Sequence, residues 1–223
     1  VKKREVANSP DAWFRLLKSR GALGIRLYRS PGKDAVFSDR ISSALVGGGG
    51  TWTMEVLFQG QTSEFWTATW EVINQNAPDR RIWRVTYGRV ARGRTSHSTS
   101  HDLPKAVREL SECLKETRAF SDKQKLDAFT KGFDEALDTI ATKGANRHGY
   151  HQDLAPKGVL SAETGMLLDA CQTAWVFGGM GSWNDLWFEG KEDQKTYERL
   201  SDRLFQTVNS AIEEAATSTF ETR

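Results

Sequence analysis

The sequence contains no uninterrupted apolar run of the roughly eighteen residues that a membrane-spanning helix needs, so no membrane partner is expected. It has only two cysteines in 223 residues, too few for a disulfide framework. Cys113 and Cys171 both lie beside apolar residues in helical patterns, which predicts two buried free thiols. Residues 1–5 are basic and lack the apolar stretch of a signal peptide, so a cytoplasmic location is expected.

The motifs of common catalytic sites are also missing. The chain has no Gly-x-Ser-x-Gly nucleophile turn, no glycine-rich phosphate loop, no Gly-x-Gly-x-x-Gly and no His-Glu-x-x-His. No catalytic residue and no cofactor is therefore predicted. The sequence favours a protein that binds over one that catalyses.

The charge of the chain is distributed unevenly. The net charge is only +2, yet residues 1–100 carry 16 basic and 8 acidic residues, whereas residues 101–223 carry 15 and 21. Such a division is typical of a chain in which one half meets a partner of opposite charge. It is equally compatible with two halves that attract each other within one fold.

The N-terminal half, residues 1–100, combines one helix with strands. Ser9 and Pro10 have the properties of a helix start, and Gly21 ends the helical pattern. A short strand is expected at 25–29, and three period-two runs separated by turn residues follow it. The apolar face of these runs, expected to be covered, carries Trp52, Met54, Val56, Phe58, Trp66, Ala68, Trp70, Val72, Trp83, Val85 and Tyr87. The opposite face, expected to be solvated, carries Glu55, Gln59, Thr67, Thr69, Glu71, Arg84 and Thr86.

Two segments of this half depart from a simple strand pattern. The turn-rich stretch 30–50 ends in the four glycines Gly47–Gly50, which predict the most flexible point of the chain. The segment Glu55–Gly60 resembles the recognition core of a picornaviral 3C protease site. It is either an engineered insertion or a native strand, and the unbroken alternation from Trp52 to Phe58 favours the native strand.

In the C-terminal half, residues 101–223, the apolar period becomes that of helices. The predicted helices begin at Leu103, at a capping box over Ser121–Gln124, at Ser161 and at Lys191, and the last two end at Gly178–Gly179 and near Thr217. This order predicts an α+β fold, in which an antiparallel β-meander of three to four strands packs against a predominantly helical C-terminal half. One composite domain is favoured over two independent ones.

The four histidines form two close pairs with the spacings His-x-x-x-His and His-x-x-His, namely His97 with His101 and His148 with His151. If the two pairs converged, they would chelate a metal and support a metal-dependent hydrolase. Histidines in polar loops are more often solvated, and this second interpretation is favoured.

Six arginines lie within residues 80–94, around Trp83 and Tyr87: Arg80, Arg81, Arg84, Arg89, Arg92 and Arg94. Arginines interleaved with aromatic residues bind single-stranded nucleic acid by charge and stacking. The alternation places both aromatic residues on the covered face, away from Arg84, which weakens this interpretation. A solvated basic edge that discourages pairing between sheets is favoured.

The loop Gly178–Phe188 contains three glycines, two tryptophans and an Asn-Asp pair. Gly178 or Gly179 is expected to cap the preceding helix in the left-handed conformation. Trp183 and Trp187 are expected to pack under the loop, with Asn184 and Asp185 bonded to the local backbone, as is typical of Asn and Asp in turns.

The run Trp175–Asp185, followed by an acidic helix, resembles uncharacterised bacterial proteins associated with toxin–immunity loci of polymorphic and contact-dependent systems. The resemblance covers about residues 160–215. It implies a cytoplasmic protein that neutralises a cognate toxin by occluding it, and it carries over no catalytic residues.

The leading hypothesis is therefore a non-enzymatic protein-binding module of the immunity type, whose partner is a toxin domain. The metal-dependent hydrolase and the nucleic-acid-binding module remain as alternatives, and the oligomeric state is left open. The expected contact residues are Trp183, Asn184, Asp185, Glu189, Glu192, Asp193, Arg80, Arg81 and Arg84.

Overall fold

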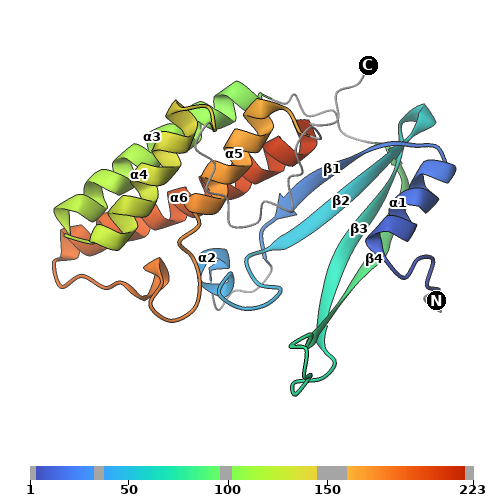
Figure 1. Cartoon of the computed structure of the whole chain (residues 1–223), viewed down its shortest axis with the longest axis horizontal. Helices are drawn as coiled ribbons and strands as arrows, with labels where there is room; N and C mark the ends of the chain where they lie inside the picture. Colours follow the sequence, from blue (N-terminus) through green and yellow to red (C-terminus); the bar gives the residue numbers. More distant parts are fainter. Residues whose placement is uncertain (1–3, 33–37, 96–101, 145–159, 219–223) are drawn as a thin grey trace. The chain divides into compact units, whose positions relative to one another are not determined.

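The computed structural model describes residues 4–32, 38–95, 102–144 and 160–218. It confirms the α+β class, with an antiparallel sheet in the N-terminal part and most helices in the C-terminal part (Figure 1). The chain divides into two compact units. The sheet unit comprises Val1–Tyr28 and Trp52–Thr99, and the helical unit comprises Arg29–Thr51 and Ser100–Arg223. The segment that links the first two strands thus belongs to the helical unit.

Helix α1 (Pro10–Ser19) forms as the sequence predicts. The Ser9 side chain accepts a hydrogen bond from the first turn, where the proline lacks only an N–H that would have no partner. The inward face of the helix contributes Leu17, which is buried against Val56 and Trp66 of the sheet. These three residues are the small core of the sheet unit.

The sheet contains four strands in the order β1-β2-β3-β4. The strands are β1 Ala22–Ser30, β2 Thr51–Phe58, β3 Thr62–Val72 and β4 Trp83–Thr95. The antiparallel pairing of β2 with β3 ends at Thr53 opposite Thr67, whereas β3 and β4 remain paired as far as Val72 opposite Trp83. Residues 68–87 therefore form a two-stranded hairpin, the β-arm, which continues beyond the pairing with β2 (Figure 1).

The predicted burial of the apolar face is wrong along the β-arm. Five large side chains of that face are exposed there: Trp70, Val72, Trp83, Val85 and Tyr87. The reason is that helix α1 covers only part of this face of the sheet. Helix α1 has only ten residues, and its buried contacts reach Val56 and Trp66 but not the arm.

The opposite face departs from prediction at Glu55, which is 1% exposed instead of solvated. Its carboxylate accepts hydrogen bonds from the hydroxyls of Ser63, at 2.6 Å, and Tyr28, at 2.8 Å. Burial, followed by the neighbouring Glu55 carboxylate, raises the pKa of Tyr28. Glu55, Val56 and Leu57, the first three residues of the segment Glu55–Gly60, are thus all buried.

The glycines at the end of the stretch 30–50, predicted to be flexible, form a closely packed turn. A Cβ atom on Gly48 would lie 1.8 Å from the carbonyl oxygen of Ser42. The Gly49 N–H donates to the Ser42 hydroxyl at 3.0 Å, and the Gly49 carbonyl accepts from the Arg29 guanidinium at 2.8 Å. Close approach of backbone to backbone explains why glycine is needed here.

Changing Gly48 to alanine is expected to destabilise the helical unit by about 1 to 3 kcal/mol, because a backbone carbonyl must move to admit the methyl group. Gly179→Ala is the matched control, since nothing lies within 4 Å of an added Cβ there. It should change stability by less than about 0.5 kcal/mol. Urea unfolding followed by far-ultraviolet circular dichroism measures both. Equal midpoints would mean that the turn relaxes without cost.

The helices of the helical unit are α2 Asp39–Ser42, α3 Leu103–Lys123, α4 Asp127–Ala141, α5 Ala162–Thr173 and α6 Lys191–Ser218. The predicted capping box over Ser121–Gln124 is wrong, because α3 continues through it to Lys123. The Ser121 hydroxyl instead donates to the Arg118 carbonyl within α3, at 2.9 Å. Phe120 explains the continuation, since it extends the apolar stripe of α3 into the core.

The predicted end of α5 also needs correction. Ser161 caps this helix as expected, by accepting from the Thr164 N–H at 3.0 Å. The helix ends at Thr173, before the glycine pair, and the loop glycine with a positive φ is Gly181, at 81°. Neither Gly178 nor Gly179 is the left-handed cap.

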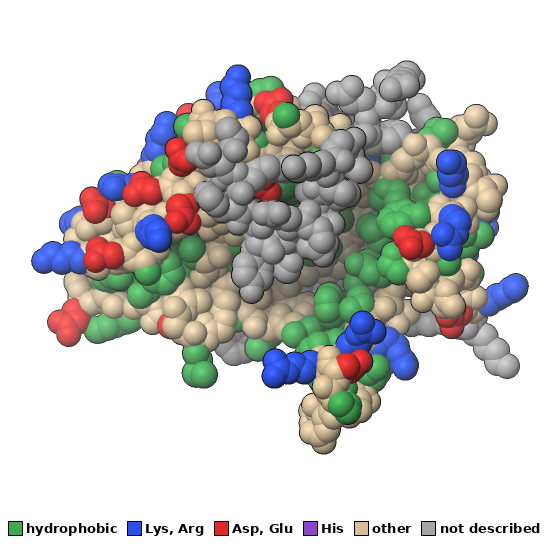
Figure 2. All heavy atoms as spheres, in the orientation of Figure 1, with side chains coloured by type: hydrophobic (Ala, Val, Ile, Leu, Met, Phe, Trp, Pro, Cys, Tyr) green, Lys and Arg blue, Asp and Glu red, His purple; other side chains and the backbone are tan. Residues whose placement is uncertain are grey.

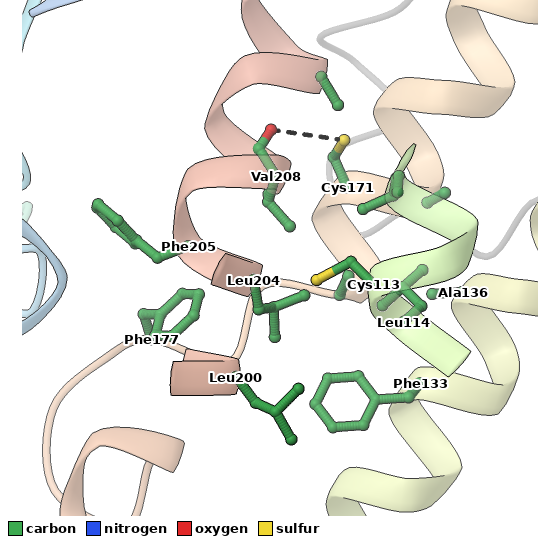
Figure 3. Packing of buried hydrophobic residues seen from close by; sticks show 14 of the residues in the cluster. Cys113, Leu114, Phe133, Ala136, Cys171, Phe177, Leu200, Leu204, Phe205 and Val208 are labelled. Carbon is green, nitrogen blue, oxygen red and sulfur yellow. Dashed lines mark hydrogen bonds between the residues drawn. The ribbon is translucent and has the colours of Figure 1, made fainter. Parts of the chain in front are cut away.

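The core of the helical unit lies between α3, α4, α5 and α6 (Figure 3). Leu114, Phe133 and Leu204 point toward one another from three of these helices. The prediction of two buried free cysteines is confirmed, and the Cys171 thiol donates to the Val208 carbonyl at 3.8 Å. Burial raises the pKa of both thiols, so neither is a ready nucleophile.

Candidate functional site

The loop between α5 and α6 is anchored by Trp183, which is 0% exposed. Its indole N–H donates to the Ser201 hydroxyl at 2.7 Å, and its carbonyl accepts from the Tyr197 hydroxyl at 2.6 Å. The ring meets Phe129 and Phe133 edge-on. The predicted packing of Trp183 under the loop is confirmed, and its side chain offers no surface to a partner.

Trp187 does not pack under the loop as predicted. It is 70% exposed, and Met180 in the same loop is fully exposed. The apolar residues that the loop presents to solvent are therefore these two and not Trp183.

Asn184 connects the loop to α2 instead of bonding to the local backbone through its side chain. Its amide oxygen accepts from the Arg40 guanidinium at 2.8 Å, and its amide nitrogen donates to the Arg40 carbonyl at 3.1 Å. Arg40 also binds Asp202 of α6 at 2.8 Å. Asp185 does bond locally, as predicted, by accepting from the Ser182 N–H at 3.1 Å. Asn184 and Asp185 are thus engaged in holding the loop in place.

The predicted acidic contact residues lie at and near the start of α6. Glu189 and Glu192 are exposed, whereas Asp193 accepts a hydrogen bond from Lys123 at 2.9 Å. Lys123, and after it Gln124, lowers the pKa of the Asp193 carboxyl. Asp193 lines a groove of about 370 Å³ between α3 and α6. The other residues that line it are Glu116, Ala119, Phe120, Lys123, Thr196, Arg199 and Leu200.

This groove is crossed by ion pairs, which limits what it can bind. Glu116 pairs with Arg203 at 2.6 Å and with Arg199 at 3.7 Å, and Arg203 is the main cause of its lowered pKa. Charges of both signs already have partners within the groove. Its chemistry is that of a solvated seam between two helices.

The arginines predicted at the basic edge lie at the free end of the β-arm and near it. Arg80, Arg81 and Arg84 are all exposed. Arg81 lies 3.8 Å from Asp79, and Arg84 lies 3.2 Å from Glu71. Two of the three positive charges are therefore close to a carboxylate.

The two histidine pairs fall outside the residues that the structure describes: His97, His101, His148 and His151. Within the described ranges, no group of three or more His, Cys, Asp and Glu side chains is arranged to hold a metal ion.

The structure brings together a candidate site that the sequence does not predict, on the α1-facing side of the β-arm. Its residues form cross-strand pairs, in which Val72 lies opposite Trp83, Trp70 opposite Val85 and Ala68 opposite Tyr87. Partners in an antiparallel pair project to the same side, so these side chains form one continuous apolar strip. Trp70 is 46% exposed and Tyr87 51%. Figure 2 shows hydrophobic side chains beside Lys and Arg at the free end of this hairpin.

A cluster of charges lies where this strip meets the covered part of the sheet. Continuing along the same ladder, Trp66 lies opposite Arg89, and Glu64 lies opposite Arg92. Glu64 is 1% exposed, and one of its oxygens is bound by Arg89 at 2.9 Å and Arg92 at 3.3 Å. Arg20, which follows α1, binds the same carboxylate.

The arginines dominate the electrostatics of this cluster. Burial acts to raise the pKa of Glu64, but hydrogen bonding and charge from Arg20, and then from Arg89, hold that pKa below its ordinary value. Three guanidinium groups share one carboxylate, so the cluster carries a positive excess. Arg20, Arg89, Arg92 and Glu64 are called the arginine cluster below.

Comparison with known proteins finds no family model, no curated protein and no solved structure that matches this chain. In the described part of the chain, no helix has the length and apolar character that crossing a membrane requires. The features that bear on function are therefore those of the fold itself, above all the exposed strip and the arginine cluster beside it.

Proposed function

We propose that this chain is a non-enzymatic protein-binding module, and that it docks its partner on the apolar strip of the β-arm. The observation that supports the proposal is the exposure of Trp70, Trp83 and Tyr87 side by side on one face. Monomeric proteins expose large apolar side chains singly, whereas a contiguous patch marks an interaction site. Tryptophan and tyrosine are also the residues that contribute most to binding at protein interfaces.

Protein is favoured over nucleic acid as the partner of this strip. Val72 and Val85 separate the aromatic rings, and aliphatic side chains give bases nothing to stack on. Glu71 and Asp79 each lie close to an arginine of the same hairpin, which reduces the positive charge that the hairpin offers to a phosphate backbone. Arg84 pairs with Glu71 and points to the other face, as its register position requires.

The particular form proposed is an immunity-type inhibitor, which neutralises a cognate toxin by occluding it. The resemblance of Trp175–Asp185 to proteins of toxin–immunity loci motivates this form. Occlusion needs an exposed binding surface and no reacting group, and the aromatic side chains of the β-arm offer such a surface. The acidic residues Glu189 and Glu192 supply a separate charged surface in the helical unit, suited to a basic partner region.

The test begins with the gene that lies beside the one encoding this chain. Its product is expected to arrest growth when expressed alone, and this chain is expected to restore growth and form a complex with it. Trp70→Ser should weaken the complex by roughly thirtyfold, the effect of losing one dominant interface residue. Because Trp70 is largely exposed, the melting temperature should change little.

Trp187→Ser is the matched control, since Trp187 is also exposed but lies in the helical unit. It should leave the affinity unchanged. A neighbouring product that is neither toxic nor bound would contradict the immunity form. A complex that Trp187→Ser weakens and Trp70→Ser does not would move the docking site to the loop between α5 and α6.

A further inference from the structure

The apolar strip and the arginine cluster form one row of side chains along β3 and β4. On β4 the row runs from Trp83 through Tyr87 and Arg89 to Arg92. Its ends are nine residue steps apart, which at about 3.3 Å per step gives a row of about 30 Å, shortened slightly by the bulges in β3–β4 pairing. Its first half is apolar and its second half is basic.

The basic half has more positive charge than its own carboxylate neutralises. Arg20, Arg89 and Arg92 bring three positive charges to the single carboxylate of Glu64. The Arg92 side chain remains 67% exposed while it contacts that carboxylate. Its remaining N–H groups are therefore open to an additional anion, and guanidinium groups bind carboxylates well.

Two tryptophan side chains lie close together beside the arginine cluster. The indole N–H groups of Trp13 and Trp66 are buried, and neither has an acceptor among the described residues. The Trp66 ring lies beside this cluster, with the Arg89 guanidinium 6.0 Å from its centre. Buried donors without acceptors are rare in folded proteins.

On the basis of the proposed function, we infer that the partner segment is bipartite, with an apolar stretch seated on the strip and carboxylates bound by the arginine cluster. Arg92 is then the main carboxylate-binding residue of this site, because it is the most exposed of the three arginines. The order along the row fixes the order along the partner. Its apolar side chains meet Trp83, Trp70 and Tyr87, and its acidic side chains follow them toward Arg92.

The probe is a synthetic peptide capped at both ends, with four apolar residues followed by three glutamates. Two-dimensional NMR of the whole protein follows its binding, because this method detects millimolar affinity and resolves the tryptophan indole signals. The signals of Trp70, Trp83 and Trp66 are expected to shift, and that of the buried Trp183 is not. Affinity should fall as the salt concentration rises.

Arg92→Gln is expected to weaken peptide binding by roughly fivefold and to reduce its salt dependence. Glu64 keeps Arg20 and Arg89 in this variant, so the sheet unit should remain folded. Arg81→Gln is the matched control, an exposed arginine just before β4, at the far end of the β-arm from the arginine cluster. It should leave the affinity unchanged, as should Arg118→Gln in the helical unit.

A peptide of the same composition with the glutamates dispersed should bind more weakly than the block peptide. Equal binding of the two peptides, or no effect of Arg92→Gln, would overturn the bipartite partner but leave the apolar docking strip in place. Failure of the block peptide to bind even at low salt would also overturn the bipartite partner. Tighter binding of oligothymidylate, weakened by both Trp70→Ser and Arg92→Gln, would replace that partner with single-stranded nucleic acid. The proposed function is judged separately, by the complex with the toxin.

Discussion

Replacing Trp183 with alanine is expected to lower the free energy of unfolding of the helical unit by about 4 kcal/mol, the usual cost of removing a large aromatic side chain from a core. The residue is fully buried and lies among the rings of Phe129, Phe133 and Tyr197. Its removal leaves a cavity that the helices around it cannot fill without moving. It also leaves the Ser201 hydroxyl without its indole donor.

Trp183→Phe separates packing from hydrogen bonding. This variant keeps most of the ring volume and loses the indole N–H, so it should lose about 1 to 3 kcal/mol. Trp187→Ala is the exposed control and should lose less than about 0.5 kcal/mol. Urea unfolding measured by circular dichroism gives the three values. If Trp183→Ala were no less stable than Trp187→Ala, the loop between α5 and α6 would not be part of the cooperative core.

The same comparison bears on function. Because Trp183 has no exposed surface, its substitution should affect binding only through loss of folded protein. Affinity measured on the folded fraction should therefore be unchanged. A loss of affinity larger than the loss of stability would make the loop a recognition site in its own right.

Local patterns were enough to predict most of the elements. The start of α1 at Ser9 and Pro10 and the extent of α6 follow from capping chemistry and from a long apolar period. The strands were predicted from the alternation of aromatic and polar residues, and the α+β class followed from their separation from the helices. These features depend on residues that are neighbours in the sequence.

Burial could not be predicted in the same way, because it depends on which element covers which face. The alternation assigns Trp70 and Tyr87 to the same face as Val56, but nothing local reveals that the buried contacts of α1 stop before the β-arm. Glu55 appears solvated by its position, yet Tyr28 from another strand makes its burial tolerable. The sequence predicts only a turn glycine at Gly48, whereas the structure places the backbone of Ser42 so close that no side chain fits there.

The arginine cluster beside the apolar strip could not be predicted from the sequence for a related reason. Irregular pairing occurs between Ser63 and Glu64 and again between Phe65 and Trp66, so the partners of Glu64 on β4 cannot be read from simple alternation. One signal was available, since Glu64 is the single carboxylate in the row that continues through Trp66 and Trp70. A charge in an apolar row needs a partner of opposite sign. The pattern of arginines around positions 89 and 92 instead favours a solvated basic edge.

Glu64→Gln is expected to destabilise the sheet unit by about 2 to 3 kcal/mol, less than for a fully buried ion pair because the arginines are partly exposed. The change removes the negative charge that Arg20, Arg89 and Arg92 share and leaves their mutual repulsion. Hydrogen exchange of the amides in β2 and β3 reports the sheet unit directly.

The effect should depend on pH in a defined direction. The arginines hold the pKa of Glu64 in the folded chain below its ordinary value of 4.5. Its stabilising contribution is therefore complete above that value and disappears as the pH falls through the lowered folded-state pKa. The stability difference between the natural chain and Glu64→Gln should accordingly be constant near neutral pH and shrink below pH 4.5, the ordinary value.

Glu71→Gln is the matched control on the same strand, since Glu71 also pairs with an arginine, Arg84, but both side chains are exposed. An exposed ion pair contributes only about 0.2 to 1 kcal/mol and is screened by salt, so this variant should remain close to the natural chain. A difference between Glu64→Gln and the natural chain that stayed constant at acid pH would contradict the charge argument. It would assign the loss to packing around Glu64, because protonation makes the natural carboxyl as neutral as the glutamine amide.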